Sequence, residues 1–421
     1  MTHANDHDVI VLGAGPAGST VSALLAEMGY RVLVVEKERF PRYHIGESII
    51  PYAWFPLNRL GLIDKLDAAP FTVRKHSVQF VGLDGTVSTP FYFFQHTDHD
   101  CARTWQVVRA DFDQFLADNA CEKGAEIRFE TAARELIMDG SRVAGVRVRS
   151  RDGREEDLRA AIIVDATGRD HFSAARHDWR LADPHLKKIA IWSYFKGAKR
   201  DPGIDEGATT VAYVPDKGWF WYIPLPDDIV SVGIVADRDY LYRGPRDPDA
   251  IFAREIDIQP WISDHVAPGV KTEPCKVTGD YSYRSRHCAR DGLVLVGDAF
   301  GFLDPVFSSG VFLALQSGWM AADAIDAALR AGDVSAGRFA DYGRRFCQGI
   351  EAMRRLVYAF YDHGFSFAAV LKKHPHLRGD MTDCLIGNVS KDFEPLFAAV
   401  REFADIPGPL PHGAPLVGVG G

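Results

Sequence analysis

The start of the chain combines apolar runs and turn residues in an order that predicts strand, tight turn and helix. Residues 9–12 are all apolar, which is typical of a strand buried on both faces of a parallel sheet. Glycines follow at once, and an alanine- and leucine-rich stretch then continues to about Met28. A second apolar strand is predicted at residues 31–35. This order favours a parallel sheet flanked by helices.

The middle of the chain alternates polar and apolar residues, as strands with one buried face do. Residues 142–150 follow this pattern and stop at Asp152-Gly153, a dipeptide typical of a hairpin turn. Further strands are predicted at residues 189–195, 209–214, 219–225 and 230–235. Because these strands follow one another closely, they predict an antiparallel sheet whose exposed face needs a cover.

One of these strands carries an aromatic face. Trp219 and Trp221 are two residues apart, so both side chains point the same way, together with Ile223. Pro224 has no backbone N–H, and we expect it to end the strand pairing. The aromatic face is either core packing or the wall of a ligand channel, and the pattern alone leaves both open.

From Val306 the pattern becomes helical. Helices are predicted at residues 314–329, 339–360 and 393–403, and the proline- and glycine-rich tail from Ile406 is expected to be poorly ordered. With 421 residues, the chain exceeds the size at which one hydrophobic core stops growing, so two or three closely associated domains are expected.

Composition narrows the class of protein. The chain is 47% hydrophobic and 25% charged, with a formal net charge of −9 and no cluster of basic residues, which argues against a nucleic-acid partner. The six cysteines form no CxxC pair, so neither a zinc site nor a disulfide framework is indicated, and no metal is expected. No signal peptide and no run of about 18 apolar residues is present, which favours a cytoplasmic protein without a transmembrane segment.

The first turn has the residues of a dinucleotide site. Gly13 permits the tight turn, Gly15 lets a pyrophosphate approach the backbone, and Gly18 allows close packing of helix on strand. Glu36 ends the second strand about 20 residues further on, where a carboxylate can accept a hydrogen bond from a ribose hydroxyl.

Two later segments favour FAD over NAD. The apolar strand at 161–164 runs into Asp165 and Gly168, and the strand at 293–296 presents Asp298 just before a helix. Asp298 can accept from the ribityl chain of a flavin, while the helix that starts near residues 308–310 can face the polar edge of the flavin ring. Together these segments resemble the FAD-binding pattern of the flavoproteins that include para-hydroxybenzoate hydroxylase, over residues 8–330.

That resemblance implies an α/β fold with a doubly wound, parallel-sheet FAD-binding domain, an inserted antiparallel substrate-side sheet and a helical C-terminal region. The expected boundaries are 1–70, 100–185 and 275–330 for the FAD-binding domain, 71–99 and 186–274 for the inserted sheet, 331–405 for the helical region and 406–421 for the tail. We expect the sheet to be covered by ligand on one side and by the flavin ring region on the other. The residues predicted to bind the cofactor are Gly13, Ala14, Gly15, Ala17, Gly18, Glu36, Lys37, Arg42, Gly46, Glu47, Ser48, Arg109, Asp165, Gly168, Asp298, Gly310 and Val311. For Arg109 the competing interpretation is a solvated face of the helix at 111–123.

Two motifs make the resemblance narrower. Residues 218–224, with Trp219 and Trp221, match the GWxWxIP motif of the flavin-dependent halogenases. Residues 304–310 match the DPxFSSG segment of the branch that acts on phenols and pyrroles, and residues 46–48 also fit this family.

The resemblance implies a halogenase. In that family a separate flavin reductase delivers the reduced flavin, which reacts with O₂ to give a flavin hydroperoxide, and halide attacks this to form hypohalous acid. A lysine then directs or carries the electrophile to an electron-rich ring. The counterpart here is Lys75, with Arg74 as the other candidate, and Trp219 and Trp221 would keep the substrate away from the oxidant. The substrate would be a phenol or a pyrrole, free or on an acyl carrier protein, and a homodimer is left open.

The chemistry of an amine supports either role of Lys75. An ammonium can donate a hydrogen bond to hypohalous acid, and a desolvated amine with a lowered pKa can instead accept the halogen. We expect Arg74 beside it to lower that pKa. Halide is expected at the backbone N–H groups of Ser309 and Gly310, where a turn enters a helix, although serine at this place is also a common helix cap.

Two other functions share these features. One is an FAD-dependent hydroxylase, or a reductase of the geranylgeranyl-reductase type, with the same fold. The other is a non-enzymatic flavin-binding protein, which would leave the matches at Lys75, Trp219 and Ser309 as coincidence. A family member that has lost its halogenase activity is a further alternative.

Overall fold

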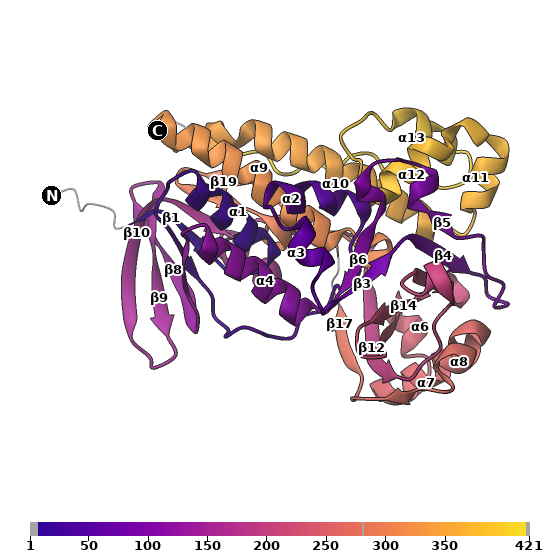
Figure 1. Cartoon of the computed structure of the whole chain (residues 1–421). Helices are drawn as coiled ribbons and strands as arrows, with labels where there is room; N and C mark the ends of the chain where they lie inside the picture. Colours follow the sequence, from indigo (N-terminus) through magenta and orange to yellow (C-terminus); the bar gives the residue numbers. More distant parts are fainter. Residues whose placement is uncertain (1–6, 280–281, 418–421) are drawn as a thin grey trace.

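A parallel sheet forms one half of the molecule, on the left in Figure 1. The computed structural model describes residues 7–279 and 282–417. The strand order is β19-β20-β10-β1-β2-β7, and every neighbouring pair except β19 and β20 is parallel. The strands are β1 (His7–Leu12), β2 (Val32–Val35), β7 (Glu126–Arg128), β10 (Glu155–Asp165), β19 (Ala289–Arg290) and β20 (Leu293–Leu295). The predicted doubly wound α/β fold is therefore confirmed.

Helices pack against this sheet, and one hairpin extends it. Helix α1 (Pro16–Glu27) packs against both α4 (Arg109–Glu122) and α9 (Gly310–Arg330). The first half of β10 pairs with β9 (Arg142–Ser150), which pairs in turn with β8 (Thr131–Asp139). The backbone N–H of Gly153 donates to the Ser150 carbonyl, which confirms the predicted hairpin turn.

The second sheet has the order β16-β12-β15-β14-β13-β4-β5, with β17 also paired to β12. All four strands predicted for the antiparallel sheet are present, and β4 adds a parallel neighbour to β13. Strand β4 lies more than 100 residues before β13 in the sequence. The local sequence pattern of β4 therefore does not predict that it pairs with β13. The strands are β4 (Ser77–Val81), β5 (Phe91–Tyr92), β12 (Lys188–Lys196), β13 (Thr209–Tyr213), β14 (Trp219–Leu225), β15 (Ile229–Asp237), β16 (Val270–Lys271) and β17 (Lys276–Gly279).

The expected end of pairing at Pro224 is wrong. Strand β14 continues to Leu225, and Pro224 stands opposite Val230 of β15. On the other side, β14 pairs with β13 only as far as Tyr222. Pro224 therefore lies beyond the last residue paired with β13. Its missing N–H costs no hydrogen bond between β13 and β14.

Helices rather than ligand cover much of the second sheet. Phe220 and Tyr222 face a cluster that includes α7 (Pro248–Ile258) and α8 (Pro260–Val266). On the opposite face, Trp219 and Trp221 belong to a cluster with the C-terminal helices. The expectation of ligand cover is therefore wrong for the face at Phe220 and Tyr222, because the helices at 238–266 were not recognised from the sequence. The opposite face, with Trp219 and Trp221, also lines a cavity.

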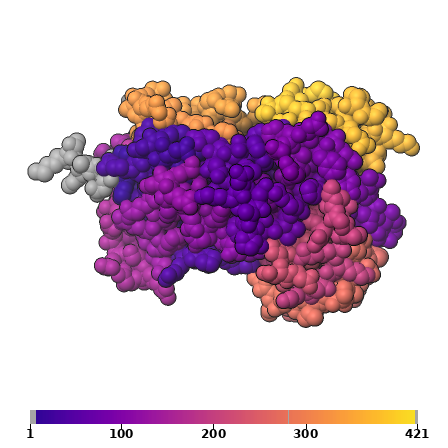
Figure 2. Space-filling model, viewed as in Figure 1, coloured from indigo at the N-terminus to yellow at the C-terminus, as the bar shows by residue number. Residues whose placement is uncertain are grey.

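The C-terminal region forms a helical layer along the upper edge of the molecule (Figures 1 and 2). The predicted helices are found as α9, α10 and α13, whereas α11 and α12 were not predicted. The helices are α10 (Ala340–Tyr361), α11 (Phe367–Lys373), α12 (Arg378–Ile386) and α13 (Glu394–Val400). The remaining helices and strands are α2 (Trp54–Arg59), α3 (Ile63–Asp67), β3 (Thr72–Lys75), β6 (Thr104–Val107), α5 (Phe172–Arg176), β11 (Arg180–Ala182), α6 (Arg238–Leu241), β18 (Tyr283–Ser285) and β21 (Gly301–Phe302).

The tail from Ile406 is not poorly ordered over the part that the structure describes, residues 406–417. Arg354 of α10 donates to the Gly408 carbonyl at 2.7 Å, and the ring of His412 contacts Glu351 at 3.1 Å. Farther along, the Leu416 N–H donates to the Ala289 carbonyl at 2.7 Å. Arg354 and Glu351 are both buried, and the tail supplies partners that buried charges need.

Candidate active site

A cavity of about 720 Å³ lies between the two sheets. Gly13 and Glu36 line it from the carboxyl ends of the parallel strands β1 and β2, where open α/β sheets bind their ligands. Trp192, Val211 and Trp219 line it from the second sheet. The cavity is thus long enough to run from the glycine turn to the aromatic strand.

At Gly13 and Gly18 the glycine turn leaves no room for a side chain. A Cβ added to Gly13 would lie 2.5 Å from the Ala166 carbonyl oxygen, and Gly13 has a φ of +103°. A Cβ on Gly18 would lie 1.9 Å from the Gly13 carbonyl oxygen, so this position holds helix α1 against the turn. The first-turn amides of α1 are free of partners within the helix, which suits a phosphate group.

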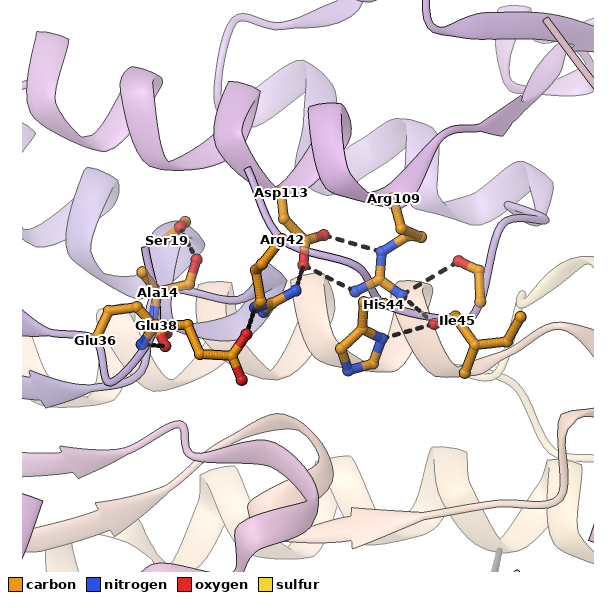
Figure 3. A network of polar contacts seen from close by, with 10 residues as sticks. Ala14, Ser19, Glu36, Glu38, Arg42, His44, Ile45, Arg109 and Asp113 are labelled. Atoms are coloured by element: carbon orange, nitrogen blue, oxygen red, sulfur yellow. Dashed lines mark hydrogen bonds and ion pairs between the residues drawn. The ribbon is translucent and has the colours of Figure 1, made fainter. Parts of the chain in front are cut away.

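Glu36 fixes the same turn, as Figure 3 shows. Its side chain is buried and accepts hydrogen bonds from the backbone N–H of Ala14 and of Glu38, both at 2.9 Å. Because it also lines the cavity, the carboxylate keeps acceptor capacity for a ribose hydroxyl.

A buried ion-pair network orients the loop on the other side of the cavity (Figure 3). Asp113 of α4 accepts from Arg109 at 2.9 Å and from Arg42 at 2.9 Å. Arg109 also donates to the carbonyls of Ile45 and Gly46 at 2.7 and 3.2 Å. Burial alone would raise the pKa of Asp113, but the charges and hydrogen bonds of Arg109 and Arg42 lower it instead. The competing interpretation of Arg109 as part of a solvated helix face is wrong, because Arg109 and its partner Asp113 are both buried.

These residues fit a bound FAD. Gly15 lines the cavity, where an added Cβ would meet only Arg42 Nη2, at 3.7 Å, so this glycine leaves the backbone open to a phosphate. Glu36 faces the same cavity, and Asp298 lines it at the far strand end. Burial raises the pKa of Asp298 to about 6, although Arg109 and Arg169 act in the opposite direction. A half-buried carboxyl that lines a cavity is expected where a polar ligand group completes its hydrogen bonds.

Lys75 is buried at the end of β3, and its amine has no acidic partner within the described residues. Nζ donates to the Ser48 hydroxyl at 2.8 Å and to the Ile49 carbonyl at 3.3 Å. Ser48 lines the cavity, so the amine lies directly behind the cavity wall. Burial lowers the pKa of Lys75 to about 7.

Arg74 does not act on Lys75 as expected. Its guanidinium pairs with Asp67 at 2.6 Å and is partly exposed, because successive residues of a strand point to opposite faces. Desolvation is therefore the cause of the lowered pKa of Lys75. Arg74, the other candidate for the family's lysine position, points away from Lys75.

A second buried group, Glu47, stands next to Ser48 and lines the same cavity. Tyr194 donates its hydroxyl proton to Glu47 Oε1 at 2.5 Å, and the Tyr43 hydroxyl lies 3.0 Å from that of Tyr194. The other carboxyl oxygen, Oε2, is buried without a hydrogen-bond partner. Burial raises the pKa of Glu47 to about 7, and the hydrogen bonds and the charges of Arg109 and Lys276 only partly offset this. Tyr194 and Tyr43 were not recognised from the sequence.

Hydrogen bonds hold the aromatic wall in place. Trp219 Nε1 donates to the Tyr361 hydroxyl at 2.8 Å, and that hydroxyl donates to Asp304 at 2.9 Å. Trp221 Nε1 donates to the Ser231 hydroxyl at 3.1 Å. The chain through Tyr361 thus links the second sheet, the end of α10 and the turn at residues 304–310.

The turn at residues 304–310 delivers a helix start to the cavity. Ser308 adopts a left-handed conformation with φ of 55°, and α9 begins at Gly310 with no side-chain cap from Ser309. The predicted start of this helix near residues 308–310 is confirmed. The competing role of Ser309 as a side-chain cap is not found, which leaves the first-turn amides of α9 available.

Most predicted site residues meet at this cavity. The lining includes Gly13, Gly15, Ala17, Glu36, Lys37, Arg42, Gly46, Glu47, Ser48, Arg109, Gly168, Trp219, Trp221, Asp298, Gly310 and Val311. Five predicted residues stand behind the lining: Ala14, Gly18, Lys75, Asp165 and Ser309. Asp165 is fully buried and accepts from the Thr167 hydroxyl at 2.6 Å and the Ser173 N–H at 2.7 Å, so it stabilises the turn itself. Within residues 7–279 and 282–417, no group of three or more His, Cys, Asp or Glu side chains is arranged to hold a metal ion.

The sequence reasoning missed part of the lining. Residues 131–134, at the start of β8, and Trp192 and Phe302 also face the cavity. The strand pattern at 131–139 carries no polar motif, so nothing in it pointed to a ligand. The ring of Phe302 lies near Gly310 at the start of α9.

The chain matches known FAD-binding proteins over most of its length. The family model described as FAD binding domain matches residues 6–349. One relative is a 1H-pyrrole-2-carbonyl-[peptidyl-carrier protein] brominase of Pseudoalteromonas luteoviolacea, 34% identical over 79% of this chain and 80% of its own length. Another is the corresponding chlorinase of Pseudomonas fluorescens, 29% identical over 91% of this chain and 90% of its own length.

Solved structures agree with these relatives. The flavin-dependent brominase Bmp2 superposes with a TM-score of 0.85 and 31% identity, covering 94% of this chain and 98% of that one. The FAD-dependent halogenase CndH superposes with a TM-score of 0.79 and 32% identity, covering 94% of this chain and 95% of that one. No helix within the described residues is long and apolar enough to cross a membrane.

Proposed function

This chain belongs to the flavin-dependent halogenases, and from that premise we propose that it halogenates a pyrrole ring carried as a thioester on an acyl carrier protein. The observation that supports this substrate is the match to two enzymes that act on carrier-bound pyrrole, which extends over 80% and 90% of their lengths. The enzyme is an FAD-dependent oxidoreductase with O₂ and halide as co-substrates.

Different residues of this chain would bind different parts of FAD. The first-turn amides of α1 would bind the pyrophosphate, and Glu36 the ribose of the adenosine. Asp298 would accept from the ribityl hydroxyls, and Arg109 holds the loop at Gly46, which would face the flavin. Bound there in its reduced form, FAD would supply hypohalous acid from O₂ and halide.

Lys75 would activate this oxidant. As an ammonium, its amine donates a hydrogen bond to the oxygen of hypohalous acid and makes the halogen more electrophilic. A pyrrole carbon then bonds to the halogen as the oxygen–halogen bond breaks, and the departing hydroxide takes up a proton to give water. The ring finally loses the proton from the substituted carbon. With a pKa near 7, part of the amine carries the proton that this role needs.

Trp219 and Trp221 would separate the substrate from the flavin. Both are buried, and both are held through their ring N–H groups. A rigid wall lets a small oxidant pass while it stops an organic ring from approaching the flavin, so halogenation replaces direct hydroxylation. Halide would bind at the backbone N–H groups of Ser309 and Gly310.

A separate flavin reductase would supply the reduced cofactor. All six cysteines are free, which fits the reducing cytoplasm where we place the reaction. A homodimer is compatible with this reaction but is not needed for it.

The test is a reconstituted reaction with flavin reductase, FAD, NADH, O₂ and bromide, acting on a carrier protein loaded with pyrrole-2-carboxylate. The expected product is the carrier with one or more hydrogens of the ring replaced by bromine, detected by mass spectrometry. Free pyrrole-2-carboxylate is the matched control and should react much less. A hydroxylated product formed with NADPH and no reductase would overturn the proposal in favour of a hydroxylase.

A further inference from the structure

A second cavity, of about 880 Å³, opens on the same molecule away from the glycine turn. It lies where the edge strands β4 and β5 meet helices α11 and α12, at the upper right of Figure 1. Its inner wall is apolar and aromatic, formed by Phe80, Phe91, Tyr213, Phe365 and Phe367. This lining and volume are typical of a site for an extended small molecule.

Lys75 stands between the two cavities. On one side, Nζ donates to Ser48, which lines the first cavity. On the other side, Nζ lies 5.7 Å from the centre of the Phe93 ring. The residues around Phe93, namely Phe91, Tyr92 and Gln95, line the second cavity. The amine therefore contacts a wall residue of the first cavity and faces Phe93, whose neighbours along the chain line the second.

The second cavity has a cationic mouth. Lys372 of α11 and Arg378 of α12 line it and are exposed, and neither has an acidic partner among the residues that the structure describes. His96 lines the same region but is paired with Asp383 at 2.8 Å. Asp216 is the acidic residue of this lining. An apolar interior with two unpaired cations at its entrance suits a ligand that is apolar at one end and anionic at the other.

We propose that the second cavity binds the phosphopantetheine arm of the carrier protein, with Lys372 and Arg378 at its phosphodiester and the thioester-bound ring pointing toward Lys75. This inference rests on the proposed carrier-bound substrate. The arm has the required order of groups: an anionic phosphate at the carrier end, an aliphatic and amide middle, and the aromatic acyl group at the tip. Guanidinium and ammonium groups bind phosphate through charge-assisted hydrogen bonds. The chain has a net charge of −9, which would repel an acidic partner, and the two cations at the mouth offset that repulsion locally.

Binding of two synthetic arms to the FAD-loaded protein tests this assignment without any turnover. Pyrrole-2-carbonyl pantetheine 4′-phosphate should bind about tenfold more tightly than the same thioester without the phosphate. In the double variant Lys372→Glu, Arg378→Glu, the two dissociation constants should become equal. The control is Arg149→Glu, since Arg149 is exposed on β9 at the far end of the molecule and should leave the tenfold ratio intact.

Several results would overturn the assignment. Equal affinity of the two arms for the unmodified protein would exclude a phosphate site at this mouth, and a ratio that persists in the double variant would place the phosphate elsewhere. Displacement of the arm by inorganic phosphate at similar concentration would show an unspecific anion site. Circular dichroism and FAD content establish that the variant is folded. Since the titration needs no halogenation, it can fail while the bromination assay succeeds, and the reverse also holds.

Discussion

Two buried ionisable residues, Lys75 and Glu47, stand on neighbouring segments at the wall of the flavin cavity. Lys75 bonds to the hydroxyl of Ser48, and Glu47 is the residue before that serine. Burial moves both pKa values to about 7 from opposite directions. A buried ionisable side chain destabilises the folded protein when it carries a charge, because the charge loses its hydration. Ionisable residues with shifted pKa values in a cavity are therefore usually functional.

The Lys75 amine should make stability rise with pH. Its folded pKa lies near 7 and the unfolded value near 10.5, so the unfolded chain binds the extra proton between these values. The free energy of unfolding then increases by up to about 1.4 kcal/mol per pH unit across this window. Lys75→Met should remove that increase, which urea unfolding at pH 7 and pH 9 can measure. An identical pH dependence in the variant and the unmodified protein would mean that the lysine is not buried as described.

The Glu47 carboxyl should have the opposite effect at lower pH. Its folded pKa is raised to about 7 from 4.5, so the folded protein holds a proton that the unfolded chain releases between these values. Stability should therefore fall as pH rises from about 4.5 to 7, by up to about 1.4 kcal/mol per unit. In Glu47→Gln this fall should disappear, as thermal unfolding at pH 5 and pH 7 would reveal. The idea is wrong if the variant loses stability over that range as steeply as the parent.

At the scale of single residues, Lys75 could be proposed from the sequence, whereas its partners could not. The position of Lys75 before a strand and the halogenase motifs make it the candidate for the family's lysine, and that role stays a prediction. Arg74 beside it was expected to lower its pKa and instead pairs with Asp67. Tyr361, which holds Trp219, is 142 residues away along the chain. Partners this distant are set by tertiary packing, and no local pattern predicts them.

At the scale of elements, the strand–turn–helix unit at residues 7–27 is the best-specified part of the fold. Its apolar strand, its glycines and its helix agree with one another, and the structure has each of them in place. The short helices at 238–266 and 367–386 were missed because their apolar residues pack on other elements rather than form a long periodic stripe.

Gly18 makes this unit testable. A Cβ at Gly18 would lie 1.9 Å from the Gly13 carbonyl oxygen, so Gly18→Ala must push α1 away from the turn. We expect FAD affinity to fall by about tenfold or more and stability to fall by roughly 1–3 kcal/mol, the usual cost of overpacking. Gly337→Ala is the matched control, because a Cβ there meets nothing within 4 Å. Flavin fluorescence titration compares the two, and equal affinity would contradict the close packing described.

At the scale of the whole molecule, two sheets and a helical layer meet around Lys75. The parallel sheet supplies the nucleotide turn, the second sheet supplies the aromatic wall, and α10 fixes that wall through Tyr361. The fold class could be predicted from residue patterns together with the resemblance. The cavity beside the C-terminal helices could not, because it is formed by segments near residues 80, 213 and 367 that come together only in the folded chain. The exact domain boundaries stay a prediction.

The central claim is that the buried amine of Lys75 couples the oxidant formed in the flavin cavity to the substrate ring. The most direct test measures brominated pyrrole on the carrier protein per O₂ consumed, for the unmodified enzyme and for Lys75→Ala under the same supply of reduced FAD. We expect the ratio to fall by about 100-fold or more in the variant, as for loss of a group that acts only in the transition state. A ratio that stays the same in Lys75→Ala would contradict the account.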